Sequence, residues 1–277
     1  MNQRAIWAIA RKDLRVVWRS RAVRLPLIIV PLLILVILPA IGGLVLSNTD
    51  PAGAAVADFQ REAARFFPHL PAGIAERLGR FDNDLQRMTY IMFNMMFPAM
   101  YLILPTMVAS VIASDSFAGE KERKTLEALA YTPTTDRELY LAKLIAPWTA
   151  GVFVGWIGYL AFAAVITATT GRMMGEAFVL ELTWLVLIFW VVPGAAALGL
   201  GVMVLVSSKV SGFQEAYQLG GVVVLPLIML LIGQLTGLIY LSTLVALIIG
   251  AVIWAVAGGM IWYGASTFRR GALIARL

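Results

Sequence analysis

The 277 residues include 22 Lys and Arg against 16 Asp and Glu, and 60% of them are hydrophobic whereas only 14% are charged. Because soluble domains average about 25% charged residues, this composition excludes an ordinary soluble domain and indicates an all-α integral membrane protein. The absence of cysteine excludes disulfides, thiolate metal sites and a cysteine nucleophile. The single histidine, His69, excludes most histidine metal clusters, so we expect no metal site. We attribute the net charge of +6 to membrane topology and expect no nucleic-acid partner.

The N-terminal segment, residues 1–24, has seven basic side chains and one acidic side chain, Asp13, among apolar residues at helical spacing. The basic residues border the apolar arc, which predicts an amphipathic elbow helix lying in the headgroup layer. A basic segment before an apolar run is also typical of a signal peptide. The apolar run between Arg24 and Asp50 is longer than the 7–15 residues of a signal-peptide core, so we expect an uncleaved first span.

Long uncharged windows then recur along the chain. Four have the length of one tilted crossing each, whereas the last, 216–268, has 53 residues and would be roughly 80 Å long as a helix. That window must fold back, and we place its turn near residues 233–240, where glycines and polar residues interrupt the apolar pattern. The sequence therefore predicts a single membrane domain, 1–277, with spans near 25–46, 89–113, 144–170, 180–206, 216–234 and 241–266.

Six spans place both termini on one side of the membrane. With the termini in the cytoplasm, 16 of the 22 Lys and Arg fall in cytoplasmic segments, as the positive-inside rule favours. We therefore expect a multi-pass protein of the plasma (cytoplasmic) membrane, the inner membrane of a bacterial cell, with both termini inside. The outer loop, 47–87, is predicted to form two short helices around Pro68 and Pro71 that cap the spans or rest on the membrane. A connecting role and a gating role for this loop stay equally open.

A charged island, residues 114–143, separates the second and third spans. It has five basic and six acidic residues in thirty, and each charge at a bilayer centre costs about 2.5–3.5 kcal/mol. We therefore expect the island to lie in water, on the cytoplasmic side by parity with the termini.

Within the island, residues 119–131 are rich in helix-forming residues, and Pro133 ends that helix because the residue before a proline avoids helical geometry. Thr135 and Glu138 have the spacing of a capping box, which predicts that a new helix begins there and runs into the third span. The product is a short amphipathic helix between two spans, suited to a partner docked from the cytoplasm. A solvated helix that merely separates two spans is the alternative.

The string EKERKTLEALAYTP, followed by RELYLAK, resembles the cytoplasmic coupling-helix signature of the permeases of type-2 ATP-binding-cassette (ABC) exporters. The elbow helix and six predicted spans are similar to the layout of that family, and within it the chain most resembles sodium-extrusion-type permeases. The family often has Gly where this chain has Lys124, and Lys143 matches the Lys that opens the next span. The resemblance implies ATPase-coupling roles for Glu120, Glu122, Arg123, Thr125, Leu126, Glu127, Leu129 and Pro133.

The resemblance also implies that the chemistry lies on another polypeptide. The chain has no G-x-x-x-x-G-K-[ST] phosphate loop, so ATP and Mg would be bound by separate cytoplasmic ABC ATPase subunits, and this chain would bind no cofactor and have no catalytic residue. Two permease subunits, identical or different, would couple ATP hydrolysis to substrate efflux. One alternative is an intramembrane enzyme, although the chain lacks an H-E-x-x-H motif and paired intramembrane carboxylates. Another is an accessory membrane anchor that recruits a cytoplasmic partner.

A substrate path would have to be lined by residues of the spans. No Asp, Glu, Lys, Arg or His lies near a predicted span centre, which argues against a proton relay. The second span is rich in Met, Phe and Tyr, which form an adaptable surface. The candidates for the path are Asn94, Phe97, Tyr101 and Gln218. Interhelical packing is the competing role for them.

Overall fold

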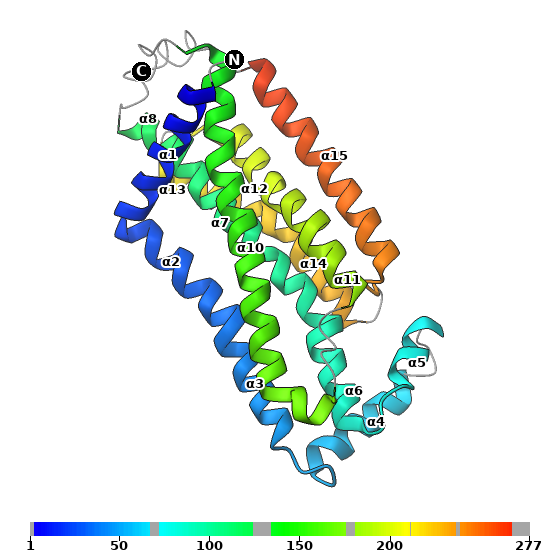
Figure 1. Cartoon of the computed structure of the whole chain (residues 1–277). Helices are drawn as coiled ribbons and strands as arrows, with labels where there is room; N and C mark the ends of the chain where they lie inside the picture. The colour runs from blue at the N-terminus through cyan, green and yellow to red at the C-terminus, as the bar shows by residue number, and fades with distance from the viewer. Residues whose placement is uncertain are drawn as a thin grey trace.

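A computed structural model describes residues 3–66, 72–123, 134–175, 181–210, 212–236 and 239–267. Within these ranges the regular elements are helices, and six stretches are long and apolar enough to cross a membrane. The helices form an elongated bundle (Figure 1). This confirms the predicted all-α membrane fold with six apolar helices.

The six candidate spans are built from one or more helical segments each. They comprise α2 (Arg21–Leu32), η1 (Leu33–Ile37) and α3 (Leu38–Ser47); α6 (Asp84–Tyr90), η3 (Ile91–Met96), α7 (Phe97–Ser114), η4 (Asp115–Gly119) and α8 (Glu120–Glu122); α10 (Asp136–Met174); α11 (Leu182–Val186), η5 (Leu187–Val191) and α12 (Val192–Ser207); α13 (Phe213–Gly220), η6 (Gly221–Val224) and α14 (Leu225–Leu235); and α15 (Thr243–Thr267). Outside the spans lie α1 (Gln3–Arg19), α4 (Ala54–Phe66) and α5 (Ala72–Leu78).

The predicted elbow helix is present as α1. Ile6 and Ile9 are buried against Leu139 and Ala142 at the start of α10, whereas the basic face of α1 is turned outwards. Ser20, with extended backbone geometry, separates α1 from α2 and so makes the bend. The helix α1 and the C-terminal end of α15 lie at the same end of the bundle, and α4 to α6 lie at the other end (Figure 1).

Prolines determine where several spans depart from α-helical geometry. Pro39, Pro98 and Pro193 each lie two residues beyond a π-helical turn. Proline lacks an N–H and its ring clashes with the carbonyl four residues earlier, so a wider turn before it relieves the clash. Pro105, in contrast, has no such turn before it, and α7 continues through it as an α-helix.

At the end opposite α1, α5 packs onto the spans. Its Ile74 and Leu78 are buried in the main hydrophobic core, and Arg77 donates to Glu181, which precedes α11, at 2.5 Å. A hydrogen bond to Tyr90 and the charge of Glu181 raise the pKa of Arg77 despite its partial desolvation. The predicted pair of short helices is therefore present, and α5 caps the ends of the spans.

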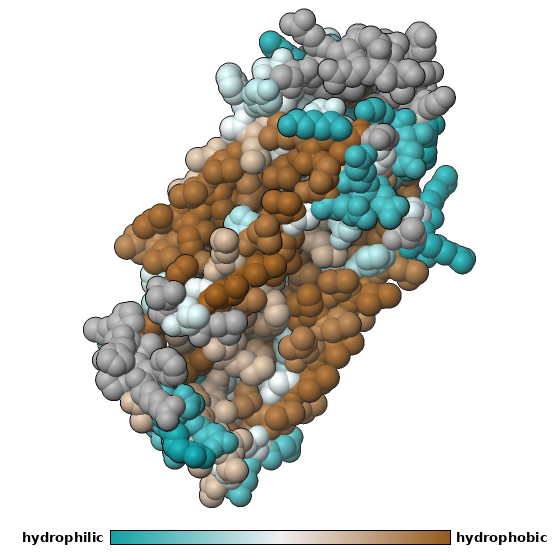
Figure 2. Space-filling model, turned by 180° about the vertical axis from the view of Figure 1, so that it is seen from behind, coloured by the Kyte–Doolittle hydropathy of each residue, from teal (hydrophilic) through white to brown (hydrophobic). Residues whose placement is uncertain are grey.

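Large apolar side chains cover the outside of the bundle between its two ends. Figure 2 shows a broad hydrophobic belt, with hydrophilic residues gathered toward either end. Among the exposed residues are Ile41, Phe153, Leu160, Met229 and Trp262, all more than half exposed. A surface of this kind is stable in lipid rather than in water, which is the arrangement of a multi-pass membrane protein.

Candidate functional site

The second span does not end where its hydropathy declines. Helical backbone continues from α7 through the π-turn η4 to Glu122, and residues 114–120 are buried in the protein. The expectation that the whole charged island lies in water is therefore wrong for four of its charges: Asp115, Glu120, Glu138 and Lys143 are buried, with at most 7% of their surface exposed. The sequence shows that these four side chains are charged, but it does not show the partners that make their burial possible.

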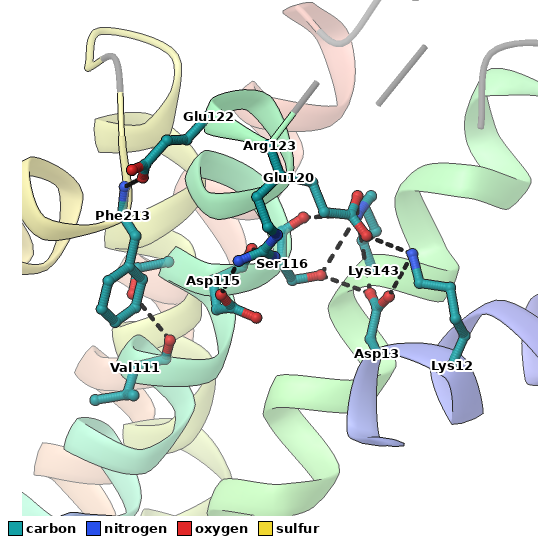
Figure 3. Close-up of polar contacts among 11 residues, drawn as sticks. Lys12, Asp13, Val111, Asp115, Ser116, Glu120, Glu122, Arg123, Lys143 and Phe213 are labelled. Atoms are coloured by element: carbon teal, nitrogen blue, oxygen red, sulfur yellow. Dashed lines mark hydrogen bonds and ion pairs between the residues drawn. The ribbon is translucent and has the colours of Figure 1, made fainter. Parts of the chain in front are cut away.

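A buried ion cluster occupies this end of the bundle (Figure 3). The ammonium of Lys143, with no exposed side-chain surface, donates to Glu120 and to the carbonyl of Ser116, the latter at 2.6 Å. The carboxylate of Asp13 lies 3.8 Å from Lys143 and accepts a hydrogen bond of 2.6 Å from the Ser116 hydroxyl. The helix α1, more than 100 residues away in sequence, therefore meets the end of the second span and the start of α10 at one point.

Lys12 completes the cluster from the partly exposed side. It donates to Glu120 and lies 3.1 Å from Oδ1 of Asp13, an ion-pair distance although Oδ1 accepts no hydrogen bond of good geometry. Partial burial lowers the pKa of Lys12, but the bond to Glu120 and the two nearby carboxylates outweigh it, so the pKa is raised. A raised lysine pKa stabilises the fold fully below the unfolded value of 10.5, and this contribution is lost only as pH rises through the folded value.

The cluster is balanced in charge. Lys12 and Lys143 compensate Asp13 and Glu120, and the Ser116 hydroxyl satisfies a remaining carboxylate oxygen. Burying these ions costs several kcal/mol each, which their mutual attraction offsets only while all partners are present. The arrangement therefore fixes the relative position of α1, η4 and α10 more than it adds net stability.

The segment that leads out of this cluster is attached to the fifth span. Glu122 accepts a hydrogen bond of 2.9 Å from the backbone N–H of Phe213, the first residue of α13, and Lys121 donates to the carbonyl of Val210 at 2.9 Å. Arg123 pairs with Asp115 at 2.9 Å, and this hydrogen bond raises the pKa of Arg123. The first residues of the predicted coupling segment are thus bonded both to the start of the fifth span and to Asp115 of η4.

The Glu122 carboxylate caps the N-terminus of α13 through its hydrogen bond to Phe213. Replacing Glu122 by alanine should reveal the free-energy cost of losing this cap. The N–H groups of the first helical turn lack partners within their own helix, and losing a cap costs about 1 kcal/mol. We expect E122A to lower the melting temperature of the purified protein by about 2 °C. The E122Q variant keeps an acceptor oxygen and should lose less. Equal melting of E122A and the wild type would contradict the capping role.

The second half of the island begins as predicted. The Thr135 hydroxyl accepts from the N–H of Glu138 at 3.3 Å, and the Glu138 carboxylate accepts from the N–H of Thr135 at 2.9 Å, so the capping box of α10 is confirmed. Of the predicted coupling residues, Glu120 is buried within the ion cluster, and Glu122 and Arg123 are exposed. The others lie outside the described residues: Thr125, Leu126, Glu127, Leu129 and Pro133.

Three of the four predicted substrate-path residues come together in an aromatic core. Trp184 donates to the Asn94 side chain at 2.5 Å and packs edge-on against Tyr101, with ring centroids 5.7 Å apart. The rings of Phe97 and Phe162 are stacked at 4.2 Å. Tyr101 is fully buried and donates to the carbonyl of Gly155 at 2.7 Å, so these residues are engaged in interhelical packing.

The fourth, Gln218, is exposed on α13, on a different segment from the aromatic core. The sequence did not predict a role for Asp13, Asp115 or Ser116. One signal was available: Asp13 is the single acid among seven basic residues of the N-terminal segment. Among the described residues, no group of three or more His, Cys, Asp or Glu could hold a metal ion.

The comparisons with known proteins agree with this architecture. Residues 7–258 match the family described as ABC-2 family transporter protein, and the match covers most of α1, the ion cluster, the first five candidate spans and the sixth span as far as residue 258. Among curated proteins, none matches the sequence. Since the family match extends over most of the chain, the protein belongs to the ABC-2 family of transporter membrane proteins and is a multi-span permease without an ATPase site of its own.

Proposed function

We propose that this permease is the membrane subunit of an ATP-driven exporter, and that its segment from Glu120 to Pro133 docks onto a separate nucleotide-binding subunit. ABC-2 permeases generally work with ATPase subunits, which supports the existence of such a partner. ATP and Mg would be bound on that subunit. A second permease copy, identical or related, would complete the pathway, and within the family the signature favours a permease of the sodium-extrusion type.

The observation that carries this proposal is the ion cluster at the base of the docking segment. Glu120 stands where the chain enters the segment and Lys143 lies shortly after it, and the two are paired in a buried site together with Asp13 of α1. A force applied to the segment would therefore reach the second span, the third span and the elbow helix together. A rigid connection of this kind suits rigid-body switching between two arrangements of the spans.

The docking residues have different expected roles. Leu126 and Leu129 supply the apolar contact, whereas Glu122, Arg123 and Glu127 supply charges at its rim. Thr125 stands between these groups in the sequence, and Pro133 is expected to end the helix. Glu120 faces inwards, so its contribution is to hold the segment rather than to touch the partner. A partner docked from the cytoplasm requires that the docking segment and both termini face the cytoplasm, and the distribution of basic residues favours this orientation of the permease.

Leu126→Asp and Glu127→Lys test the proposal. The tagged chain is expressed with its partner from the native host, purified and placed in lipid, and both the ATPase activity and the amount of co-purified ATPase subunit are measured. A central interface residue contributes 2 kcal/mol or more, so we expect L126D to weaken the association about 30-fold while the protein stays in the membrane. Glu127→Lys should weaken it less, because rim charges contribute little affinity.

Two control variants separate docking from folding. Leu126→Met keeps an apolar side chain and should retain the partner, and Glu76→Lys reverses an exposed charge at the opposite end of the bundle and should have no effect. Normal ATPase recovery and activity with L126D would refute the docking assignment. An accessory anchor would instead retain a partner whose ATPase activity is unchanged by removal of the permease, and an intramembrane enzyme would co-purify with no ATPase.

A further inference from the structure

An apolar groove lies where the elbow helix α1 and the first span meet the rest of the bundle. Its volume is about 340 Å³, and its walls come from α1, α2, α7 and α10, with Val17, Leu27, Ile112 and Phe153 among the lining residues. This is more than twice the volume of an engineered apolar cavity of 150 Å³ that stays dry and binds benzene. The groove is therefore large enough for an apolar ligand and offers little to hold water.

The groove continues along the first span. A second hollow of about 250 Å³ shares Leu27, Ile28, Phe153 and Val154 with the first and extends between η1 and α10 as far as Val36. From Leu27 to Val36 is nine residues, or about 14 Å along a helix. Together the two hollows form one elongated apolar groove that begins beside α1 and follows the first span into the depth of the membrane.

The mouth of the groove is cationic. Arg24 lines it and uses one of its five N–H donors in a long hydrogen bond of 3.4 Å to the carbonyl of Trp18. In the C-terminal half of α1, Arg11, Arg15 and Arg19 are exposed and add to the positive charge of this end of the bundle. The acid of this segment, Asp13, is buried and already compensated within the ion cluster. The mouth therefore attracts an anion.

We propose that this groove binds an anionic phospholipid of the leaflet that holds α1, with one acyl chain along the first and third spans and the phosphate at Arg24. The apolar length matches a chain, and the charged mouth matches a headgroup. A second copy of the permease is disfavoured as occupant, because a two-fold interface there would bring identical arginine-rich surfaces together. A bound lipid would fill the space beneath α1 and so support the helix that supplies Lys12 and Asp13 to the ion cluster.

Lipid binding to the purified full-length chain, together with the subunits that co-purify with it, tests this site by native mass spectrometry. The probes are phosphatidylglycerol and phosphatidylcholine with identical acyl chains. Since one basic residue near an anionic lipid contributes about fivefold in affinity, we expect wild type to prefer phosphatidylglycerol by at least that factor, and Arg24→Gln to lose about fivefold of this preference. Arg21→Gln removes the same charge three residues away, outside the groove lining, and should keep most of it.

The apolar part of the groove is tested separately. Ala150→Leu narrows the groove and should weaken binding of both lipids, whereas Leu160→Phe, on the exposed face of α10 away from the lining, should not. Equal binding of the two lipids by wild type, equal losses in R24Q and R21Q, or undiminished binding by A150L would each overturn the proposal. So would release of the bound phosphatidylglycerol during ATP turnover, because the lipid would then be cargo. The measurements of lipid binding do not depend on the docking segment, so they can fail independently of the proposed function.

Discussion

Replacing Lys143 by methionine is expected to destabilise the folded chain by about 3–5 kcal/mol, the usual cost of leaving buried charges without their partner. Lys143 has no exposed surface and holds Glu120, the carbonyl of Ser116 and the nearby carboxylate of Asp13. Without Lys143, the buried carboxylates of Asp13 and Glu120 would have to share Lys12 as their cationic partner, and the Lys12 side chain is 42% exposed. The change therefore removes a charge that neither water nor another side chain can replace.

The effect of K143M would be measured as the amount of folded protein in the membrane and as the melting temperature, which we expect to fall by roughly 6–10 °C. Adding Glu120→Gln should recover part of the loss, because it leaves one carboxylate opposite one lysine; such non-additivity is the mark of residues in one network. Lys209→Met, at an exposed position, is the matched control. Melting of K143M within about 2 °C of wild type would show that the cluster is not essential to the fold.

The charged island shows where sequence reasoning succeeds and where it stops. The capping box of Thr135 and Glu138 was predictable, because its two residues are three positions apart and each satisfies the other locally. The pairing of Lys12 with Glu120 joins residues 108 positions apart, and that of Lys143 with Glu120 joins residues 23 positions apart. Hydropathy alone assigned Glu120 and Lys143 to water, since nothing in the local pattern indicates which partner compensates them.

For the membrane spans, too, the sequence predicts one part of the structure and leaves another part open. Length and apolar composition predicted six membrane helices, because the bilayer imposes both. Neither property determines which face of each helix is turned inwards. The residues of the predicted substrate path therefore could not be separated from packing residues: Asn94 and Tyr101 are engaged with Trp184, whose position follows from the contact between the second and fourth spans.

Placing valine at Gly199 should disrupt the contact between α7 and α12. A Cβ atom at this position would lie 2.5 Å from the backbone carbonyl oxygen of Thr106 and 2.7 Å from the hydroxyl of Ser110. Because the first neighbour is backbone, the two helices must move apart, and close helix contact through small residues is a main source of cohesion in membranes. Overpacking of this kind costs about 1–3 kcal/mol, and the extra methyl groups of valine place G199V at the upper end.

The graded series G199A and G199V separates steric pressure from a change in helix propensity. Alanine favours a helix over glycine by about 0.5–1 kcal/mol, so any loss in G199A must come from the contact with Thr106. Gly259→Ala is the matched control, since a Cβ there meets nothing within 4 Å and the same gain in propensity is unopposed. We expect melting temperatures in the order G259A, wild type, G199A, G199V, from highest to lowest. If G199V melted with wild type, α7 and α12 would not be held at the separation that brings Thr106 against Gly199.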